Sequence, residues 1–238
     1  KYCHLGIQYQ QEKENYREKN RDLAFLQWIA GSAYLEQKNY VKADSLSKAA
    51  LSFYQNGDSF WSYRMFIYIS LAKLNQELKN DQRAEEYFQQ AMAEKKAYAK
   101  YKDRDFASLY TAVSDFYFQT GHLDKALEYT QKALQQIFPK FNENNFLANP
   151  SLDAVYPEPW IMSVTDQKGK VLLALYQKNK DHNYLKSAAD CYELAIKTMR
   201  QQKAIYGSES AKYYIGDYSH IYIERAIDIY YQLYQLKG

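Results

Sequence analysis

The fold of this chain is decided by the stretch Ser108–Phe138, which reads SLYTAVSDFYFQTGHLDKALEYTQKALQQIF. Gly121 marks a turn between its two halves. Ala126 and Ala133 place small side chains on the second half, with larger residues on either side of them. Because closely packed helices need small side chains where their backbones cross, the stretch predicts a pair of antiparallel helices.

The first helix of this pair carries a motif that recurs along the chain. Val113, Ser114 and Tyr117 fit the pattern L-G-x-x-Y, and with the two alanines they resemble a tetratricopeptide repeat. Three more pairs resemble it: Ala30, Gly31, Tyr34 with Ala43, Ser47, Ala50; Leu71, Ala72, Asn75 with Ala84, Phe88, Ala91; and Leu172, Leu173, Tyr176 with Ala188, Tyr192, Ala195. The resemblance implies an all-α fold, a TPR-like α-solenoid in which antiparallel helix pairs form a superhelix.

The helices are expected to be longer than those of an ordinary repeat. Ala43, Ala84 and Ala126 occupy equivalent positions, and their spacings are 84 − 43 = 41 and 126 − 84 = 42 residues. An ordinary repeat has about 34 residues. The excess is about two helical turns, so each helix of a pair gains roughly one turn and the register is kept.

One helical-repeat domain is expected over residues 1–238, with a single interruption. All 4 prolines fall between Pro139 and Asp166, where each removes a backbone donor and disfavours helix at the residue before it. The apolar content of this insertion argues against disorder, so we expect an ordered strap along the helices. The predicted boundaries are a partial repeat at 1–20, repeats at 22–56, 59–100 and 103–138, the insertion at 139–164, a repeat at 165–206 and a terminal helix at 208–238, with Ser59, Thr165 and Ser208 as N-caps.

Composition and charge narrow the classes of function. The chain has 31 basic and 28 acidic residues, and its net charge of +3 is too small to predict a nucleic-acid or membrane partner. No apolar run reaches the ~18 residues of a membrane span, and no signal peptide is visible, so we expect the cytoplasm although the sequence starts at Lys1. Cys3 and Cys191 are far apart and lack paired histidines, which predicts neither a disulfide framework nor a zinc site. We expect no cofactor and no metal.

The second half of the chain resembles a more specific group of proteins. The runs ALQQIFPKFNENNFLANPSL and KGKVLLALYQKNKDHNYLKSAADCYELAIKTMR, followed by a long helix containing ERAIDIYYQLYQL, resemble the region before the peptidase of bacterial CHAT-domain proteins. In that family, tetratricopeptide repeats precede a caspase-like domain. The resemblance covers about residues 107–238 and implies that such a domain follows Gly238, so no catalytic residue is carried over to this chain.

The candidate binding surface is the inner wall of the superhelix, which the first helix of each pair lines. In the standard repeat, the second, fifth and ninth residues of the first helix face that wall. Here these residues are Phe25, Trp28 and Ser32; Phe66, Ile69 and Lys73; Ser108, Thr111 and Asp115. They predict a groove that is aromatic at one end and polar at the other, and the alternative is that Phe25, Trp28 and Phe66 belong to the core.

Catalysis is not expected, because no nucleophile or acid–base pair is assembled. The 4 histidines are His4, His122, His182 and His220. His122 and His182 fall in predicted turns, and the adjacent Cys3 and His4 would point in different directions on a helix. A second candidate surface is the Lys- and Tyr-rich run 94–103, whose Lys95, Lys96, Lys100 and Lys102 could bind single-stranded nucleic acid. Flanking acidic residues favour a solvated helix end instead.

Three functions follow from these patterns. The preferred one is a non-catalytic module that binds a protein or peptide and serves as the sensing or regulatory region of a CHAT-type protease. The caspase-like domain of the same polypeptide would then be a further partner. The second is an assembly scaffold unconnected to any protease. The third, a single-stranded nucleic-acid binder, is disfavoured by the low net charge, and no membrane partner is expected.

Overall fold

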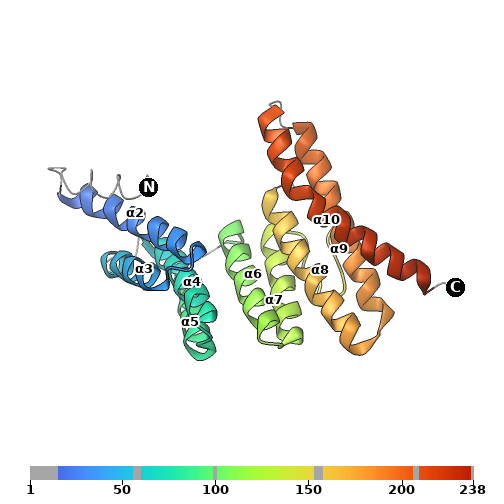
Figure 1. Cartoon of the computed structure of the whole chain (residues 1–238), viewed down its shortest axis with the longest axis horizontal. Coiled ribbons are helices and arrows are strands. Elements are labelled where there is room, and N and C mark those ends of the chain that lie inside the picture. Colours follow the sequence, from blue (N-terminus) through green and yellow to red (C-terminus); the bar gives the residue numbers. More distant parts are fainter. Residues whose placement is uncertain (1–15, 56–59, 99–100, 153–157, 206–208, 237–238) are drawn as a thin grey trace. The chain divides into compact units, whose positions relative to one another are not determined.

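The computed structural model describes residues 16–55, 60–98, 101–152, 158–205 and 209–236 (Figure 1). Within these ranges the regular structure is helical and no strand occurs, so the predicted all-α class is confirmed. None of the helices in the described part of the chain combines the length and the apolar character that a bilayer crossing requires. The helices pack in consecutive pairs, the architecture of an α-solenoid.

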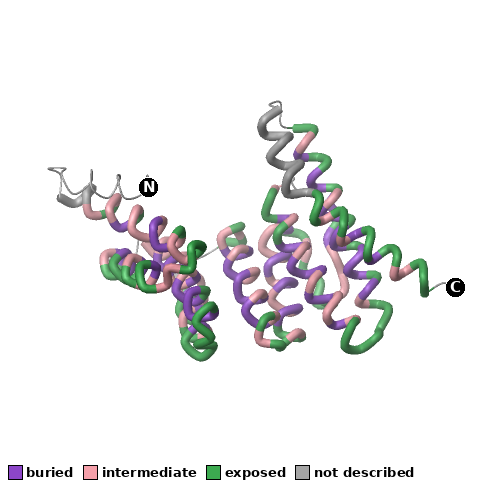
Figure 2. The backbone as a smooth tube through the Cα atoms, in the orientation of Figure 1, coloured by how far each residue is buried: buried purple, intermediate pink, exposed green. Residues whose placement is uncertain are grey.

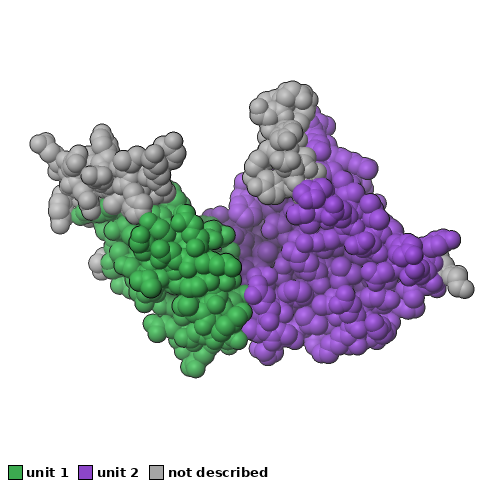
Figure 3. Space-filling model, viewed as in Figure 1, with its two compact units in different colours: residues 1–100 green, residues 101–238 purple. Residues whose placement is uncertain are grey.

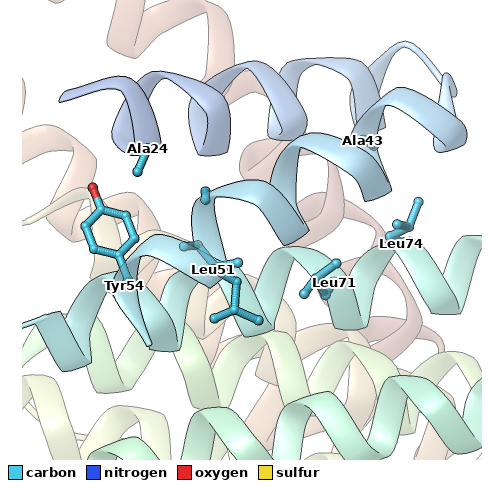
Figure 4. Close-up of a cluster of buried hydrophobic side chains, with 8 residues drawn as sticks. Ala24, Ala43, Leu51, Tyr54, Leu71 and Leu74 are labelled. Carbon is cyan, nitrogen blue, oxygen red and sulfur yellow. The ribbon is translucent and has the colours of Figure 1, made fainter. Parts of the chain in front are cut away.

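The chain divides into two compact units, residues 1–100 and 101–238 (Figure 3). The first unit holds two helix pairs, α2 (Tyr16–Glu36) with α3 (Tyr40–Tyr54) and α4 (Trp61–Glu77) with α5 (Asp81–Tyr98). Helices α3 and α4 join the pairs through a core in which Tyr54 and Leu51 lie near Leu71 and Ala24 (Figure 4). The Tyr54 hydroxyl donates to the carbonyl of Arg21 at 3.1 Å, which satisfies this buried polar group.

The second unit holds two further pairs and a long terminal helix. The pairs are α6 (Arg104–Gln119) with α7 (Leu123–Ile137) and α8 (Pro159–Asn179) with α9 (His182–Ile205). Helix α10 (Glu209–Gln235) packs on α9, and α7 packs on α8. The buried faces of these helices are visible as the purple segments of Figure 2.

All four pairs turn at the same place relative to the repeat motif. Each pair has one residue with positive φ at its turn, four positions after a residue of the repeat motif (38 − 34 = 79 − 75 = 121 − 117 = 180 − 176 = 4). The residues with positive φ are Lys38, Lys79, Gly121 and Lys180, and the residues four positions before them are Tyr34, Asn75, Tyr117 and Tyr176, respectively. We call these four preceding residues the turn-anchor residues. In the first three pairs, the anchor carbonyl accepts a bond from the N–H five residues later, at 2.8 to 2.9 Å, which is the Schellman arrangement. In the fourth pair, the Tyr176 carbonyl accepts from Lys180 at 2.7 Å.

Two predicted boundaries are wrong. Helix α8 begins at Pro159 and not at Thr165, because proline fits the first position of a helix, where its missing N–H costs nothing. Thr165 is buried inside α8 and its hydroxyl donates to the Ile161 carbonyl at 2.7 Å. Helix α2 begins before residue 20, so the predicted break between a partial repeat at 1–20 and a repeat at 22–56 does not occur. Ser59 and Ser208, predicted as N-caps, lie outside the described residues, as do Cys3 and His4.

Helix α9 departs from the register that its sequence motif suggests. Ala126 of α7 lies five residues after Gly121, and the same count from Lys180 reaches Leu185, three before the expected Ala188. Tyr192 therefore takes the place of a small residue. Its ring packs on Gly169 of α8, where an added Cβ would lie only 2.6 Å from the Tyr192 Cε2 atom. In the fourth pair, the second helix therefore supplies the large side chain at this contact, and the first helix supplies the small one.

The described part of the insertion, residues 139–152, forms a strap held by polar bonds. Lys168 of α8 is fully buried, and its ammonium donates to Gln131 Oε1 at 2.8 Å and to the Ala148 carbonyl at 2.6 Å. Ser187 of α9 donates to the Leu147 carbonyl at 2.7 Å. Leu152 packs into the core beside Phe138. The described part of the strap is therefore bonded to α7, α8 and α9.

Candidate functional site

Four aromatic rings gather on α2 and α4, the first helices of the two pairs in the first unit. Phe25 and Trp28 of α2 lie edge-to-face with Tyr63 of α4, with ring centroids 6.1 and 6.4 Å apart. Trp28 stacks on Phe66 at 5.8 Å, and Phe25 meets Trp28 edge-to-face at 5.8 Å. These separations suit attractive aromatic contacts. We call Phe25, Trp28, Tyr63 and Phe66 the aromatic patch.

The aromatic patch is open to solvent at one end. Phe25 is 40% exposed, whereas Trp28, Tyr63 and Phe66 are half-buried. Large aromatic side chains that pair with each other and still meet water are typical of protein-binding surfaces, because they supply contact area at low entropic cost. The alternative that these rings belong to the core holds in part, because Trp28 packs against the buried cluster around Tyr54 and Leu71, whereas Phe25 is exposed.

Two serines form a polar edge beside the rings. The indole Nε1 of Trp28 donates to Ser70 Oγ at 3.1 Å, and Ser70 in turn donates to the Phe66 carbonyl at 3.1 Å. Ser32 Oγ lies 3.4 Å from Ser70 Oγ. These bonds connect α2 with α4 and fix the orientation of the Trp28 ring. The patch is therefore held in place before any ligand arrives.

The nine residues predicted to line a groove lie in different environments in the structure. Phe25, Trp28 and Phe66 come together in the patch, with Ser32 beside them. Ile69 is 6% exposed and lies in the core, and Lys73 is exposed on α4. Tyr63 was not among the predicted residues. Tyr63 could have been predicted from the sequence, because it lies about one turn before Phe66 on the same helix and both rings therefore lie on one face.

The other three predicted residues lie on α6, in the second unit. Ser108, Thr111 and Asp115 are each half-buried. The Thr111 hydroxyl donates to the Ala107 carbonyl at 2.7 Å, and the Asp115 carboxylate accepts from Gln119 at 2.8 Å. The polar atoms of Thr111 and Asp115 are bonded within the helix, and none of these three residues is aromatic, so they form no counterpart to the aromatic patch.

One of the four lysines of the nucleic-acid alternative and one flanking acidic residue form bonds within the protein. Lys102 donates to Asn142 Oδ1 at 2.6 Å and to the Pro139 carbonyl at 3.3 Å, so it fastens the strap. Glu94, at the other end of the run, forms a buried bidentate pair with Arg64, with both N···O distances 2.7 Å. Lys100 lies outside the described residues. These bonds give Glu94 and Lys102 a structural role.

Two fully buried residues of the second unit, Cys191 and Lys168, have pKa values that burial shifts. Burial raises the pKa of the Cys191 thiol to about 12, so the thiolate is scarce at neutral pH. Burial lowers the pKa of Lys168 to about 8, but its ammonium is fully enclosed and bonded to the strap. Among the described residues, no three His, Cys, Asp or Glu side chains gather as metal ligands. The aromatic patch is therefore the candidate site.

Comparison with known proteins supports the fold. No protein-family model matches the sequence, and none of the curated proteins compared with it is significantly similar. Among solved structures, the crystal structure of BtubC (BKLC) from P. vanneervenii is similar to this chain, with a TM-score of 0.64 and 13% sequence identity. The match covers 99% of this chain and 88% of BtubC. At this identity the likeness establishes a shared all-helical architecture and nothing about function.

Proposed function

We propose that this chain is a non-catalytic helical-repeat module of the tetratricopeptide type that binds a protein or peptide through the aromatic patch. The observation that carries the proposal is the exposure of Phe25 within a group of mutually packed rings. The repeat assignment is supported by the shared turn geometry of the four helix pairs and by the structural likeness to BtubC.

The chemistry of the patch defines its ligand. Four rings and two serine hydroxyls offer apolar contact and hydrogen bonding, and no charged side chain belongs to the group. Such a surface suits a segment with one or two large apolar side chains inserted among the rings. Lys73 is exposed further along α4, beyond the rings in sequence. An acidic peptide held mainly by charge is therefore disfavoured.

The test is selection of peptides on the intact chain followed by affinity measurement. A displayed peptide library is selected on the wild-type protein, and individual peptides are then titrated by calorimetry. Phe25→Ala should weaken selected peptides about tenfold or more, because an exposed ring at the centre of a contact is typically worth above ~1.4 kcal/mol. Trp160→Ala removes another exposed aromatic side chain, on α8, and is the matched control. Peptides that bind the Phe25→Ala variant as tightly as the wild type would contradict the proposal.

We further propose that this binding regulates a CHAT-type protease. The support is the resemblance of residues 107–238 to the region before the caspase-like domain of that family. Ligand binding, or displacement of the strap, would be transmitted to that domain. The sequence of the complete open reading frame decides between this role and the alternative of a stand-alone scaffold: a caspase-like domain after Gly238 favours regulation, and a stop codon there favours the scaffold.

A further inference from the structure

The described part of the strap is anchored in the apolar core at its two ends. Phe138, just before it, and Leu152 are 2% and 4% exposed and belong to the core cluster of the second unit, and Pro150 is buried as well. Between these anchors, none of residues 139–149 is buried. We call residues 139–149 the latch segment. Because hydrophobic burial is the main stabilising force in folding, lifting this segment would give up little of it.

Polar side chains of the helices hold the latch segment by its backbone. Gln131 of α7 donates from Nε2 to the carbonyls of Glu143 and Asn145, at 2.9 and 3.2 Å. Lys168 and Ser187 bond the next carbonyls along the segment, as described above. Water competes well for bonds of this kind, so each contributes only a modest net stabilisation.

The backbone–backbone bonds of the latch segment are local. The Phe141 N–H donates to the Phe138 carbonyl at 2.9 Å, and the Ala148 N–H donates to the Asn145 carbonyl at 3.0 Å. Both bonds join residues three positions apart, so they can persist when the segment moves away from the helices. Lifting the segment therefore breaks side-chain bonds and leaves no backbone ladder to disrupt.

The surface beneath the latch segment is polar and enclosed. Lys168 and Cys191 are fully buried, and the Cys191 thiol donates to Asn149 Oδ1 at 3.3 Å. The partners of the Lys168 ammonium are two neutral oxygens, and its lowered pKa reports the cost of keeping the charge away from water. Water that enters on opening relieves this cost, which favours the open arrangement.

The helices under the strap also pack on each other without the latch segment. Leu134 of α7, Ile161 of α8 and Leu194 of α9 lie in one buried cluster. Tyr192 of α9 packs on Gly169 of α8. These contacts lie outside residues 139–149, so they are retained when the segment lifts.

We propose that the latch segment opens as a local unit, hinged at Phe138 and Pro150, while α7, α8 and α9 stay folded. The open state exposes Lys168, Ser187 and Cys191, and the closed state hides them again. Segments with little buried apolar surface open at a lower free energy than the whole domain. The proposal concerns the equilibrium of the strap itself and depends neither on the aromatic patch nor on a protease domain.

The Cys191 thiol reports the opening, because a reagent reaches it only when its cover is removed. The intact chain carries Cys3→Ser, which removes the other of its 2 cysteines, and is treated with excess aromatic disulfide reagent at fixed pH. The labelling rate is measured at urea concentrations well below the unfolding transition. Local opening exposes little surface, so this rate should be nearly independent of urea, whereas labelling through global unfolding rises steeply with urea.

Two asparagines of the latch segment provide a matched pair of variants. Asn142 accepts from Lys102 at 2.6 Å, whereas the exposed Asn144 makes no side-chain bond to another described residue. Asn142→Ala removes a bond that exists only in the closed state. It should raise the labelling rate about fivefold in the urea-independent range. Asn144→Ala should label at the wild-type rate.

Two results would overturn the proposal. One is a labelling rate that follows global unfolding down to zero urea, which would mean that the strap stays closed for as long as the helices are folded. The other is an equal rate at low urea for the wild type and Asn142→Ala, which would mean that Cys191 is reached by some other movement.

Discussion

At the scale of single residues, Arg64 and Lys168 are the buried cations of the described ranges, and their bonding partners differ. Arg64 of α4 is 6% exposed and donates from Nε and Nη2 to both Glu94 oxygens, and from Nη1 to the Tyr54 carbonyl at 3.0 Å. Its charge is neutralised by a carboxylate in bidentate geometry. Lys168 is bonded to one amide oxygen and one carbonyl oxygen, neither of which carries a full charge.

Removing the partner of Arg64 should be costly. Glu94→Gln leaves the guanidinium buried without a counter-charge, and we expect a loss of roughly 3 kcal/mol in the free energy of unfolding. Asp44→Asn breaks the exposed pair between Asp44 and Lys48 on α3, and its cost should stay below ~1 kcal/mol. Urea denaturation of both variants checks the difference. Equal costs would contradict a structural role for the buried pair.

The lowered pKa of Lys168 predicts how stability changes with pH. Its folded value of about 8 lies below its unfolded value of 10.5, chiefly because burial disfavours the charged form. At pH 7 Lys168 is protonated in both the folded and the unfolded state, so the free-energy cost of burying its charge is present in full. Between these two values the unfolded chain retains a proton that the folded chain has released, so the Lys168 contribution to stability rises with pH and is lost again as pH falls through 8.

Lys168→Met removes this titration and is the comparison that isolates it. From pH 7 to pH 10, the wild type should gain about 2 kcal/mol in the free energy of unfolding relative to Lys168→Met. Other titrating groups are common to both proteins and largely cancel. Urea titrations at several pH values measure the difference. A difference that is constant over this range would show that the ammonium is not penalised by burial.

At the scale of elements, the chain ends its first helices with a common device. A left-handed residue and a backbone bond to the turn-anchor carbonyl close α2, α4 and α6 alike. Glycine occupies the left-handed position only at Gly121. At the other three pairs a lysine does so, although a side chain costs about 1–2 kcal/mol in that conformation.

Replacing a lysine at one of these turns with glycine should raise the stability of the protein. Lys79→Gly relieves the strain of a positive φ of 60° and should raise the free energy of unfolding by about 0.5–1 kcal/mol, since the greater freedom of glycine in the unfolded chain offsets part of the gain. The matched reverse change, Gly121→Ala at φ 79°, should lower it by about 1 kcal/mol. Thermal denaturation of the two variants should move Tm in opposite directions, and shifts of the same sign would be inconsistent with this account.

At the scale of the whole molecule, each compact unit has a core of its own. The first is built around Tyr54 and Leu71, and the second around Leu134 and Ile161. Repeat arrays derive their stability from contacts between neighbouring elements, so a unit with complete pairs is able to fold by itself.

Residues 101–238, expressed separately, should therefore fold cooperatively. We expect a helical circular dichroism spectrum and a sigmoidal thermal transition. Leu134→Ala, which removes a fully buried side chain, should destabilise this fragment by roughly 3 kcal/mol. A fragment with a gradual, non-cooperative transition would show that the second unit depends on the first.

The sequence by itself was enough for the helix pairs, their lengthened spacing and their turns. Small residues such as Ala43 and Ala126 lie where helix backbones cross, and this requirement is local enough to read from spacing. Three of the four anchor positions carry the expected tyrosine. Part of the candidate site was also predictable, because Phe25, Trp28 and Phe66 occupy positions that line the inner wall in the tetratricopeptide repeat that the sequence resembles.

Only the tertiary structure decided what packs across from each residue. Tyr192 takes a small residue's place because Gly169 lies opposite it, and the two are 23 positions apart (192 − 169 = 23) on different helices. Ile69 and Phe66 are both apolar residues of α4, yet Ile69 is buried and Phe66 is not, since burial depends on the neighbouring helix. Periodicity defines the faces of a helix, and the packing of other helices determines which of those faces meet water.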